Sequence, residues 1–370
     1  MRKYDIRAMK KLQKETSIIE NNGIKIILKP SPGEERPGYL DPMELSLMEE
    51  NHWAGNLNSE EPASPPSMKE MLPIIREAMG FPNYNLNTVE IHTKYEEITS
   101  SGNTVGLWRY YPRKSQKNTK RPALVFFHGG GWIGGSVYTV ENFCKYIAEL
   151  ADAVVFNVDY SLAPEKPYPN GLNDNYCAVK HVFDHAEAYG VDPEKICVGG
   201  DSAGGNYAAA VSLKARDEGT PKIAMQVLIY PCVILSDVPV EGYEWSEDFF
   251  EVSEEQKDMI KNFLTLGRPA KEEDNPFAGA YATGKDHYHP YVSPALAETH
   301  EGLPKAILAG AEYDGLRVQT EFYAKQLKDA GVETSCFRYK GTTHAFIDKL
   351  GHLPQAEDLA IEIANEMKKI

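Results

Sequence analysis

From Pro122 onward, short runs of apolar residues alternate with longer segments in which apolar positions recur at helical spacing. The short runs predict strands at residues 123–127, 153–159, 196–199, 224–230, 306–309 and 334–339. The longer segments predict helices at residues 140–150, 173–189, 205–218, 317–330 and 355–369. Because parallel strands need long crossover connections, this alternation predicts an α/β fold with a mostly parallel central sheet and helices on both faces. A ligand of such a sheet lies beyond the carboxyl ends of the strands.

Two other segments have patterns of their own. Alternating apolar and polar residues at 88–98 and 104–111 surround Ser101-Gly102-Asn103 and predict a β-hairpin. Residues 236–290 are rich in aromatic residues and contain a helical pattern at 253–266. A structureless loop of that length is improbable inside a compact domain, so this segment is predicted to be an inserted cap.

These boundaries divide the chain into three parts. The core domain is predicted to comprise residues 88–235 and 291–370, with the cap between them. Residues 1–87 form a separate N-terminal segment, which is rich in Pro, Glu, Asn and Met and has one helical pattern at 68–79.

Composition excludes several classes of function. A formal net charge of -15 repels nucleic-acid phosphates and argues against a DNA or RNA partner. No apolar stretch resembles a signal-peptide core or approaches the roughly 20 residues of a membrane span. Five scattered cysteines, with no C-x-x-C pair, indicate free thiols in a reducing compartment. We therefore predict a cytoplasmic protein with no membrane partner.

The first chemical motif is Gly200-Asp201-Ser202-Ala203-Gly204-Gly205, which follows a predicted strand and precedes a predicted helix. In that setting G-x-S-x-G is a nucleophile elbow, in which serine occupies a strained turn and glycines let strand and helix approach. The helix N-terminus then points its free N–H groups at the site where an oxyanion forms. Ser202 is the predicted nucleophile; the alternative is a plain turn with a capping serine.

A second motif, His128-Gly129-Gly130-Gly131-Trp132, follows the predicted strand at 123–127. Three consecutive glycines expose backbone N–H groups to a ligand, as an oxyanion hole requires. A phosphate-binding loop is the alternative, but the run lacks both the Lys-Ser/Thr of a P-loop and the G-x-G-x-x-G spacing.

A serine hydroxyl needs a base to take its proton and a carboxylate to orient that base. His344 is the one histidine in a glycine-containing loop just after a late strand. Asp314 follows the preceding strand, and the order Ser, Asp, His is that of this type of elbow. Glu312 is a rival for the acid, and a helix N-cap is an alternative role for Asp314.

Two histidine pairs were considered as metal ligands. His181 and His185 have helical spacing but lack a neighbouring glutamate and a third ligand, so a solvated helix face is the better interpretation. His287 and His289 are interpreted as part of the edge of the cap. We predict no metal and no cofactor.

Several motifs together resemble the hormone-sensitive-lipase-like family of α/β-hydrolases, in its bacterial esterase branch. The matching stretches span residues 122–346 and are His128 to Trp132, Gly200 to Asn206, Tyr160 to Glu165, Tyr291 to Pro294, Asp314 to Arg317 and Thr343 to Phe346. The chain departs from the family at Gly315, where proline is frequent, and at Val318 and Gln319, where acidic residues are frequent.

The resemblance implies roles for further residues. Gly130, Gly131 and Ala203 would donate the oxyanion-hole N–H groups, and residues 1–87 would join residues 236–290 in the cap. We also assign Trp132 and Asp201, which lie within the two motifs, to substrate binding. A homodimer through the edge strand of the core is compatible with the family.

These observations predict an α/β-hydrolase that cleaves small carboxylic esters with short acyl chains through Ser202, His344 and Asp314. Two alternatives remain open. The same triad cleaves amides, so amidase or peptidase activity is one, and a non-catalytic ligand-binding protein on this fold is the other.

Overall fold

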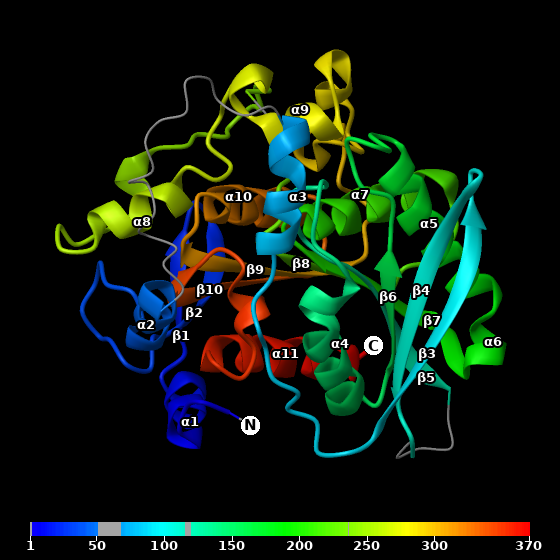
Figure 1. The fold of residues 1–370 in the computed structure, drawn as a ribbon, viewed down its shortest axis with the longest axis horizontal. Coiled ribbons are helices and arrows are strands. Elements are labelled where there is room, and N and C mark those ends of the chain that lie inside the picture. The colour runs from blue at the N-terminus through cyan, green and yellow to red at the C-terminus, as the bar shows by residue number, and fades with distance from the viewer. Residues whose placement is uncertain (1, 51–67, 115–119, 236) are drawn as a thin grey trace.

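A single ten-stranded sheet runs through the computed structural model, which describes residues 2–50, 68–114, 120–235 and 237–370 (Figure 1). Its strands are β1 (Ser17–Asn21), β2 (Ile24–Lys29), β3 (Ile91–Ser100), β4 (Asn103–Pro112), β5 (Arg121–Phe127), β6 (Val154–Asp159), β7 (Val191–Asp201), β8 (Met225–Ile229), β9 (Lys305–Tyr313) and β10 (Thr334–Thr343). They lie side by side in the order β1-β2-β10-β9-β8-β7-β5-β6-β4-β3. Every neighbouring pair from β2 to β6 is parallel, which confirms the predicted α/β class.

The predicted hairpin is present as the antiparallel pair β3 and β4, and β4 pairs with β6. Its turn is tighter than the sequence indicated, because Ser100 pairs directly with Asn103. Both turn residues have positive φ, 48° for Ser101 and 85° for Gly102, as the right-handed twist of a two-residue hairpin turn requires.

Helices cover both faces of the sheet. They are α1 (Ile6–Lys14), α2 (Pro42–Glu50), α3 (Met68–Ala78), α4 (Val137–Ala151), α5 (Asn170–Asp184), α6 (Ala186–Tyr189), α7 (Ala203–Glu218), α8 (Lys257–Leu264), α9 (Pro276–Tyr281), α10 (Leu316–Asp329) and α11 (Pro354–Met367). One buried cluster lies between the sheet and α4 and α11, and another lies between the opposite face and α5, α7 and α10 (Figure 1). Burial of these apolar faces is the main force that holds the layers together.

The N-terminal segment differs from the prediction that it belongs to the cap. β1 and β2 form an antiparallel hairpin, and β2 pairs in parallel with β10, so this part extends the core sheet. Sequence patterning missed these strands because the runs around Ile18 and Ile26 are short and interrupted by Glu20 and Lys25. β1 and β3 are therefore the edge strands of the sheet among the described residues.

A third part of the N-terminal segment, α3, lies on the side of the sheet where the nucleophile motif stands. α3 lies above the carboxyl ends of the central strands, beside the inserted segment that contains α8 and α9 (Figure 1). Arg76 of α3 donates hydrogen bonds to the carbonyl oxygens of Ile133 (2.6 Å) and Ala163 (3.1 Å) and pairs with Glu165.

The predicted helix at 253–266 is shorter than expected, because only Lys257–Leu264 is α-helical.

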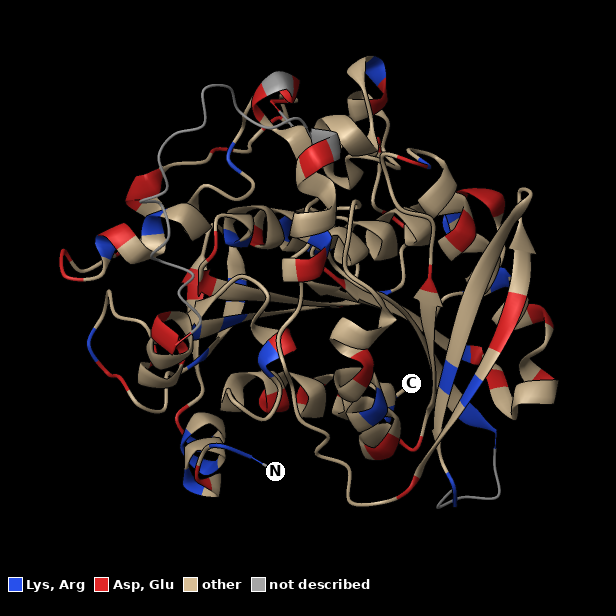
Figure 2. Ribbon diagram, viewed as in Figure 1, with Lys and Arg blue, Asp and Glu red and all other residues tan. Residues whose placement is uncertain are grey.

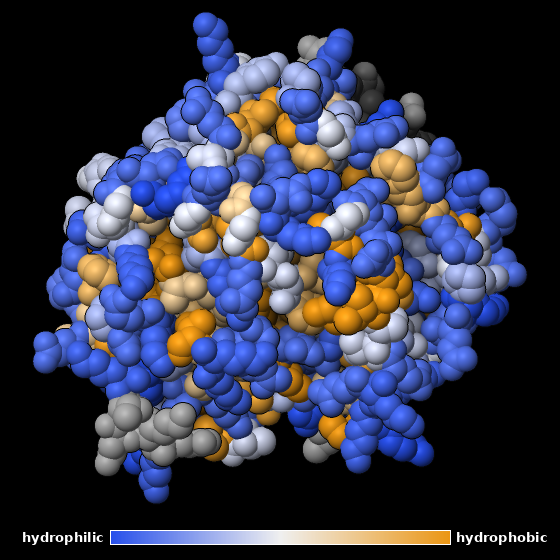
Figure 3. Space-filling view, turned by 180° about the vertical axis from the view of Figure 1, so that it is seen from behind, coloured by the Kyte–Doolittle hydropathy of each residue, from blue (hydrophilic) through white to orange (hydrophobic). Residues whose placement is uncertain are grey.

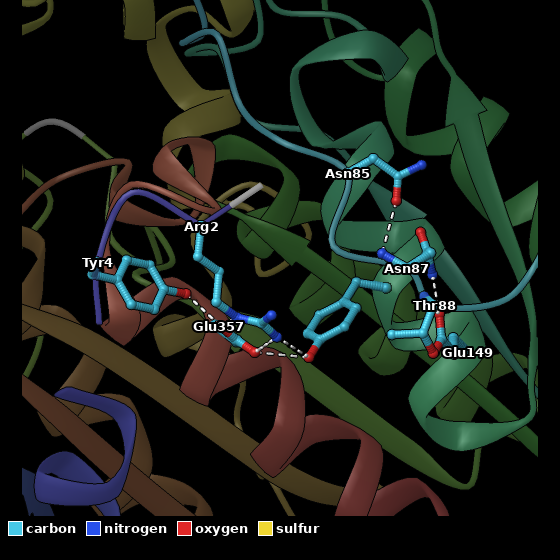
Figure 4. Close-up of polar contacts among 8 residues, drawn as sticks. Arg2, Tyr4, Asn85, Asn87, Thr88, Glu149 and Glu357 are labelled. Carbon is cyan, nitrogen blue, oxygen red and sulfur yellow. Dashed lines mark hydrogen bonds and ion pairs between the residues drawn. The ribbon is translucent and has the colours of Figure 1, made fainter. Parts of the chain in front are cut away.

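The start of the chain is anchored on α11 through Glu357, which is buried. Arg2 donates two hydrogen bonds to its carboxylate, Tyr4 donates a third, and Tyr146 of α4 donates a fourth at 2.8 Å (Figure 4). Nearby, the amide of Asn87 and the N–H of Thr88 donate to Glu149 on α4. A buried carboxylate is stable only when it is paired in this way.

Charged residues lie mainly on the outer helices and the β3–β4 hairpin, while the central strands carry few (Figure 2). The face opposite to that of Figure 1 is mostly hydrophilic, with groups of hydrophobic residues between the polar ones (Figure 3). No helix in the described ranges combines the length and apolar character that crossing a bilayer requires. All five cysteines are free thiols.

Candidate active site

Ser202 lies at the sharp turn between β7 and α7, at the carboxyl end of the sheet. Its backbone has φ 54° and ψ -116°, a strained conformation for a residue with a side chain. The glycines around it permit the turn, since a Cβ on Gly204 would lie 1.9 Å from the carbonyl oxygen of Phe127. The start of α7 therefore passes too close to the end of β5 for any residue other than glycine at this position. The turn aims the Ser202 hydroxyl away from the sheet, where it is partly exposed.

The side chains of the three predicted triad residues form a chain of hydrogen bonds, in which His344 contacts both Ser202 and Asp314. His344 Nε2 lies 2.9 Å from Ser202 Oγ, and His344 Nδ1 lies 2.6 Å from Asp314 Oδ2. Because a carboxylate only accepts, Nδ1 carries the proton and Nε2 is free to accept one from the serine hydroxyl. The arrangement can therefore draw the proton from Ser202 as the hydroxyl attacks an acyl carbon.

Asp314 is fully buried directly after β9. Its second oxygen, Oδ1, accepts the N–H of Leu316 at 2.9 Å, at the start of α10. The N-cap of α10 is Gly315, so Asp314 stands one position before the cap and contacts the first helical N–H in addition to His344. A carboxylate held at both oxygens has one fixed direction toward His344.

The electrostatic surroundings of His344 favour its protonated form. Burial by itself would lower the pKa of His344, but the charge of Asp314 and its hydrogen bond, with Asp201 adding to them, raise that pKa above the usual 6.5. The imidazole also packs against the ring of Tyr230, with 4.7 Å between centroids. His344 is thus held as a base that is stronger than a histidine in water.

The glycine run after β5 bends across the same site. Gly130 and Gly131 have φ of 125° and 59°, and a Cβ on Gly130 would lie 2.1 Å from the carbonyl oxygen of Gly134. Within the described residues, no hydrogen bond occupies the N–H groups of Gly130 and Gly131. The N–H of Ala203, the first residue of α7, has no partner within its helix. These three N–H groups are therefore available to an acceptor, as an oxyanion hole requires.

Comparison with known proteins places this geometry in a family. The sequence profile of the alpha/beta hydrolase fold matches residues 124–348, well over half of the chain. The chain belongs to the hormone-sensitive-lipase-like α/β-hydrolases. This assignment confirms the resemblance found in the motifs.

Relatives of this hydrolase bear esterase names. It is 32% identical to the esterase LipI of Mycobacterium tuberculosis over 70% of this chain and 77% of that protein. It is 36% identical to an arylesterase of Saccharolobus solfataricus over 62% of this chain and 70% of the relative. Among solved structures, the hyperthermophilic esterase of Pyrobaculum calidifontis matches with a TM-score of 0.71 at 30% identity, covering 90% of this chain and 98% of the other.

Two residues assigned to substrate binding have other contacts in this hydrolase. Asp201 is buried, and its Oδ1 accepts the N–H of Gly129 at 2.8 Å, so it holds the glycine loop against the elbow. Burial raises the pKa of Asp201 to about 6. Trp132 is buried against Tyr281, with centroids 4.7 Å apart, and its indole donates to Asn206. Both side chains are buried and support the framework of the site, and their assignment to substrate binding stays a prediction.

The rival acid, Glu312, points to another partner. Its Oε2 accepts the N–H of Gly341 at 2.7 Å, and burial raises the pKa of its carboxyl. Glu312 therefore binds the backbone of the loop that carries His344, while Asp314 contacts the imidazole itself. Glu312 is the next-to-last residue of β9, whereas Asp314 follows the end of the strand, and the two carboxylates have different partners.

The histidine pairs weighed as metal ligands make protein contacts. His181 contacts the hydroxyl of Tyr189 at 2.9 Å, and its ring stacks on His185 with centroids 4.1 Å apart. In the cap, His287 contacts the carbonyl of Ala282. Across the described ranges, no three His, Cys, Asp or Glu side chains are grouped so as to hold a metal ion.

Sequence reasoning missed other residues that support the site. Asn206, one turn after the nucleophile, donates to the carbonyl oxygens of Cys232 (2.8 Å) and Val292 (2.9 Å) and so ties α7 to two loops. Asp41 and Glu44 of the N-terminal segment contact the loop that carries His344. No pattern could have signalled Asp41 or Glu44, because their partners lie about 300 positions away in the sequence.

Proposed function

We propose that the protein hydrolyses small carboxylic esters with short acyl chains through a triad of Ser202, His344 and Asp314. One observation carries the proposal: His344 is hydrogen-bonded to both Ser202 and Asp314 at the N-terminus of α7. The class of reaction rests on the relatives. The chain is a carboxylesterase, because the relatives and solved structures that match most of its length are esterases.

The geometry supports a two-step mechanism. Ser202 Oγ attacks the ester carbonyl carbon as His344 Nε2 takes its proton, and the N–H groups of Gly130, Gly131 and Ala203 stabilise the resulting oxyanion. The intermediate collapses to an acyl-enzyme as the imidazolium returns the proton to the leaving alcohol. Water, deprotonated by His344, then attacks the acyl carbon and releases the acid. Asp314 stabilises the imidazolium in both steps.

The elements above the site support a short acyl group. Phe277 of α9 lies against the glycine loop, 3.3 Å from the place a Cβ on Gly131 would occupy. Tyr281 of the same helix stacks on Trp132, and Arg76 of α3 holds the loop from the other side. Side chains of both the insert and the N-terminal segment therefore restrict the space beside the oxyanion loop.

This restriction leads to an expected substrate profile. In a series of p-nitrophenyl esters from acetate to palmitate, kcat/KM should peak among the short chains and fall toward the long ones, because long chains meet the aromatic side chains of α9. Initial rates measured below the micellar range give the profile. A steady rise toward palmitate would contradict the short-chain proposal. Turnover of anilides in the absence of any ester turnover would favour the amidase alternative.

The raised pKa of His344 predicts a pH dependence. Only the neutral imidazole accepts the serine proton, so kcat/KM should increase as pH rises through the pKa of His344 and level off above it. The midpoint is expected above the usual 6.5 of histidine. Rates from about pH 5 to about pH 9 test this in a constant-ionic-strength buffer.

Asp201 titrates in a neighbouring range and needs a control. Asp201→Asn keeps an oxygen acceptor for the Gly129 N–H but removes the smaller of the two carboxylate charges, after that of Asp314, that raise the pKa of His344. The increase in rate with pH should persist in this variant and move to lower pH. Its complete loss in Asp201→Asn would assign the titration to Asp201 instead.

A further inference from the structure

A buried acid of the N-terminal segment contacts both ends of the loop that carries His344. Glu44 lies on α2 and has no exposed surface. Its Oε1 accepts hydrogen bonds from the backbone N–H and the hydroxyl of Thr343, the residue before His344. The same oxygen accepts a hydrogen bond from the ammonium group of Lys349, with 2.6 Å between Nζ and Oε1. One carboxylate oxygen therefore joins positions 343 and 349, on either side of the catalytic histidine.

The neighbouring residue Asp41 holds the same loop one step earlier. Its backbone N–H donates to the carbonyl oxygen of Gly341 at 2.9 Å. Gly341 has φ 71°, and a Cβ there would lie 2.6 Å from that nitrogen, so the contact depends on glycine. The Asp41 carboxylate is itself buried and held by Ser31 (2.6 Å) and Gln355 (3.2 Å). α2 is thus fixed against the loop by its own network.

The imidazole needs such support because it has few contacts of its own. Its direct polar partners are Asp314 and Ser202, and its ring packs on Tyr230. Ala345, the next residue, has a positive φ of 62°, so the chain leaves His344 through a strained turn. A strained turn persists only where its surroundings hold it. Glu44 holds the chain on both sides of this turn through its hydrogen bonds to Thr343 and Lys349.

We propose that Glu44 is a positioning residue that keeps His344 Nε2 within hydrogen-bond reach of Ser202. The inference rests on the proposed triad. It assigns to α2 a part in catalysis, although α2 contributes no group that touches the substrate. Misplacement of a catalytic group by about 1 Å can lower the rate roughly 100-fold, so loss of this grip should act on kcat.

The test compares three variants on the best short-chain p-nitrophenyl ester. Glu44→Ala removes all three hydrogen bonds and should lower kcat about 10- to 100-fold with little change in KM. Glu44→Gln keeps an oxygen at the Oε1 position, and its new NH₂ replaces Oε2, which has no hydrogen-bond partner among the described residues. This conservative variant should recover most of the kcat, because the contacts to Thr343 survive.

Glu357→Ala is the matched control. Glu357 is also a buried acid that links the N-terminal segment to the core, but its hydrogen bonds come from Arg2, Tyr4 and Tyr146, and none of these residues belongs to the histidine loop (Figure 4). Glu44→Ala and Glu357→Ala should both lower Tm, while only Glu44→Ala lowers kcat at a temperature where both are folded. An equal loss of kcat in the two variants would show general loosening and overturn the inference.

A spectroscopic measurement reports on His344 directly. The downfield proton resonance of Nδ1–H, identified by its absence in His344→Ala, should shift or broaden in Glu44→Ala and stay in place in Glu357→Ala. If Glu44→Ala does not fold, Thr343→Val removes one donor to Glu44 and should lower kcat about tenfold. An unchanged resonance and a kcat within twofold of wild type in the folded variant would overturn the positioning role.

Ser202→Ala separates the two hypotheses. If it abolishes ester turnover while Glu44→Ala does not affect kcat, the triad stands and the inference about Glu44 fails. If Ser202→Ala retains full turnover, the proposed function itself fails.

Discussion

Replacement of Ser202 by alanine is expected to lower kcat for short-chain esters by roughly 10⁵- to 10⁶-fold. The acyl-enzyme cannot form without Oγ, and the residual rate comes from the oxyanion donors and from binding alone. Tm should change little, because the side-chain hydroxyl contacts only His344 among the described residues. Steady-state kinetics on purified protein, together with a thermal melt, measure both quantities.

The other triad residues provide the controls. His344→Ala should reduce kcat to a similar level, and Asp314→Asn should lower it about 10⁴-fold, because the amide stabilises the wrong tautomer of the imidazole. The double variant Ser202→Ala/His344→Ala should be no slower than either single variant, since residues that act as a unit are not additive. Multiplicative losses would mean that the two residues act independently, which contradicts the proposed mechanism.

Replacement of Gly204 by alanine is expected to lower the free energy of unfolding by about 3 kcal/mol or more. The added Cβ would lie 1.9 Å from the carbonyl oxygen of Phe127, where β5 crosses the start of α7. The obstacle is backbone, which cannot rotate away, so β5 and α7 must separate. Urea unfolding followed by circular dichroism gives the difference in free energy.

Gly279 offers a matched comparison for this substitution. It also lies within a helix, α9, but a Cβ there would meet its nearest atom, on the side chain of Glu272, at 3.4 Å. Gly279→Ala should therefore be neutral or raise the free energy of unfolding by up to about 1 kcal/mol, through the higher helix propensity of alanine. If Gly204→Ala were as stable as Gly279→Ala, close packing at the elbow would not be what requires glycine.

The pattern of apolar and polar residues predicted correctly those elements whose structure depends on residues close together in the sequence. The strands of the central sheet, their crossover helices and the β3–β4 hairpin follow from apolar periodicity and turn residues. The motifs around Ser202 and Gly130 were recognisable because each needs glycines at fixed offsets from a strand end. The predicted ends of β9 and β10 were less accurate. Both strands continue to Tyr313 and Thr343, through stretches that contain glycine and charged residues.

Local pattern gave no information where a residue's partner is distant in the sequence. Asp201 and Trp132 lie within the two motifs, and their position along the chain gave no sign that both are buried against other loops. The hairpin of β1 and β2 is short and marginal by its own pattern, and it becomes a strand pair because β10 offers an open edge. Pairing with that edge satisfies backbone groups that no local property encodes.

The α/β class, the elbow at Ser202, the glycine loop and the chain order of Ser202, Asp314 and His344 could all be predicted from the residues alone. These depend on residue type at short spacing, where steric and conformational preferences act within a few residues. The folded structure was needed to show that Asp314 and Glu312 have different partners, that α3 and α9 contact the glycine loop, and that Glu44 binds the histidine loop. Such contacts depend on the packing of elements that are remote in the chain, because burial and hydrogen-bond satisfaction are properties of the assembled fold.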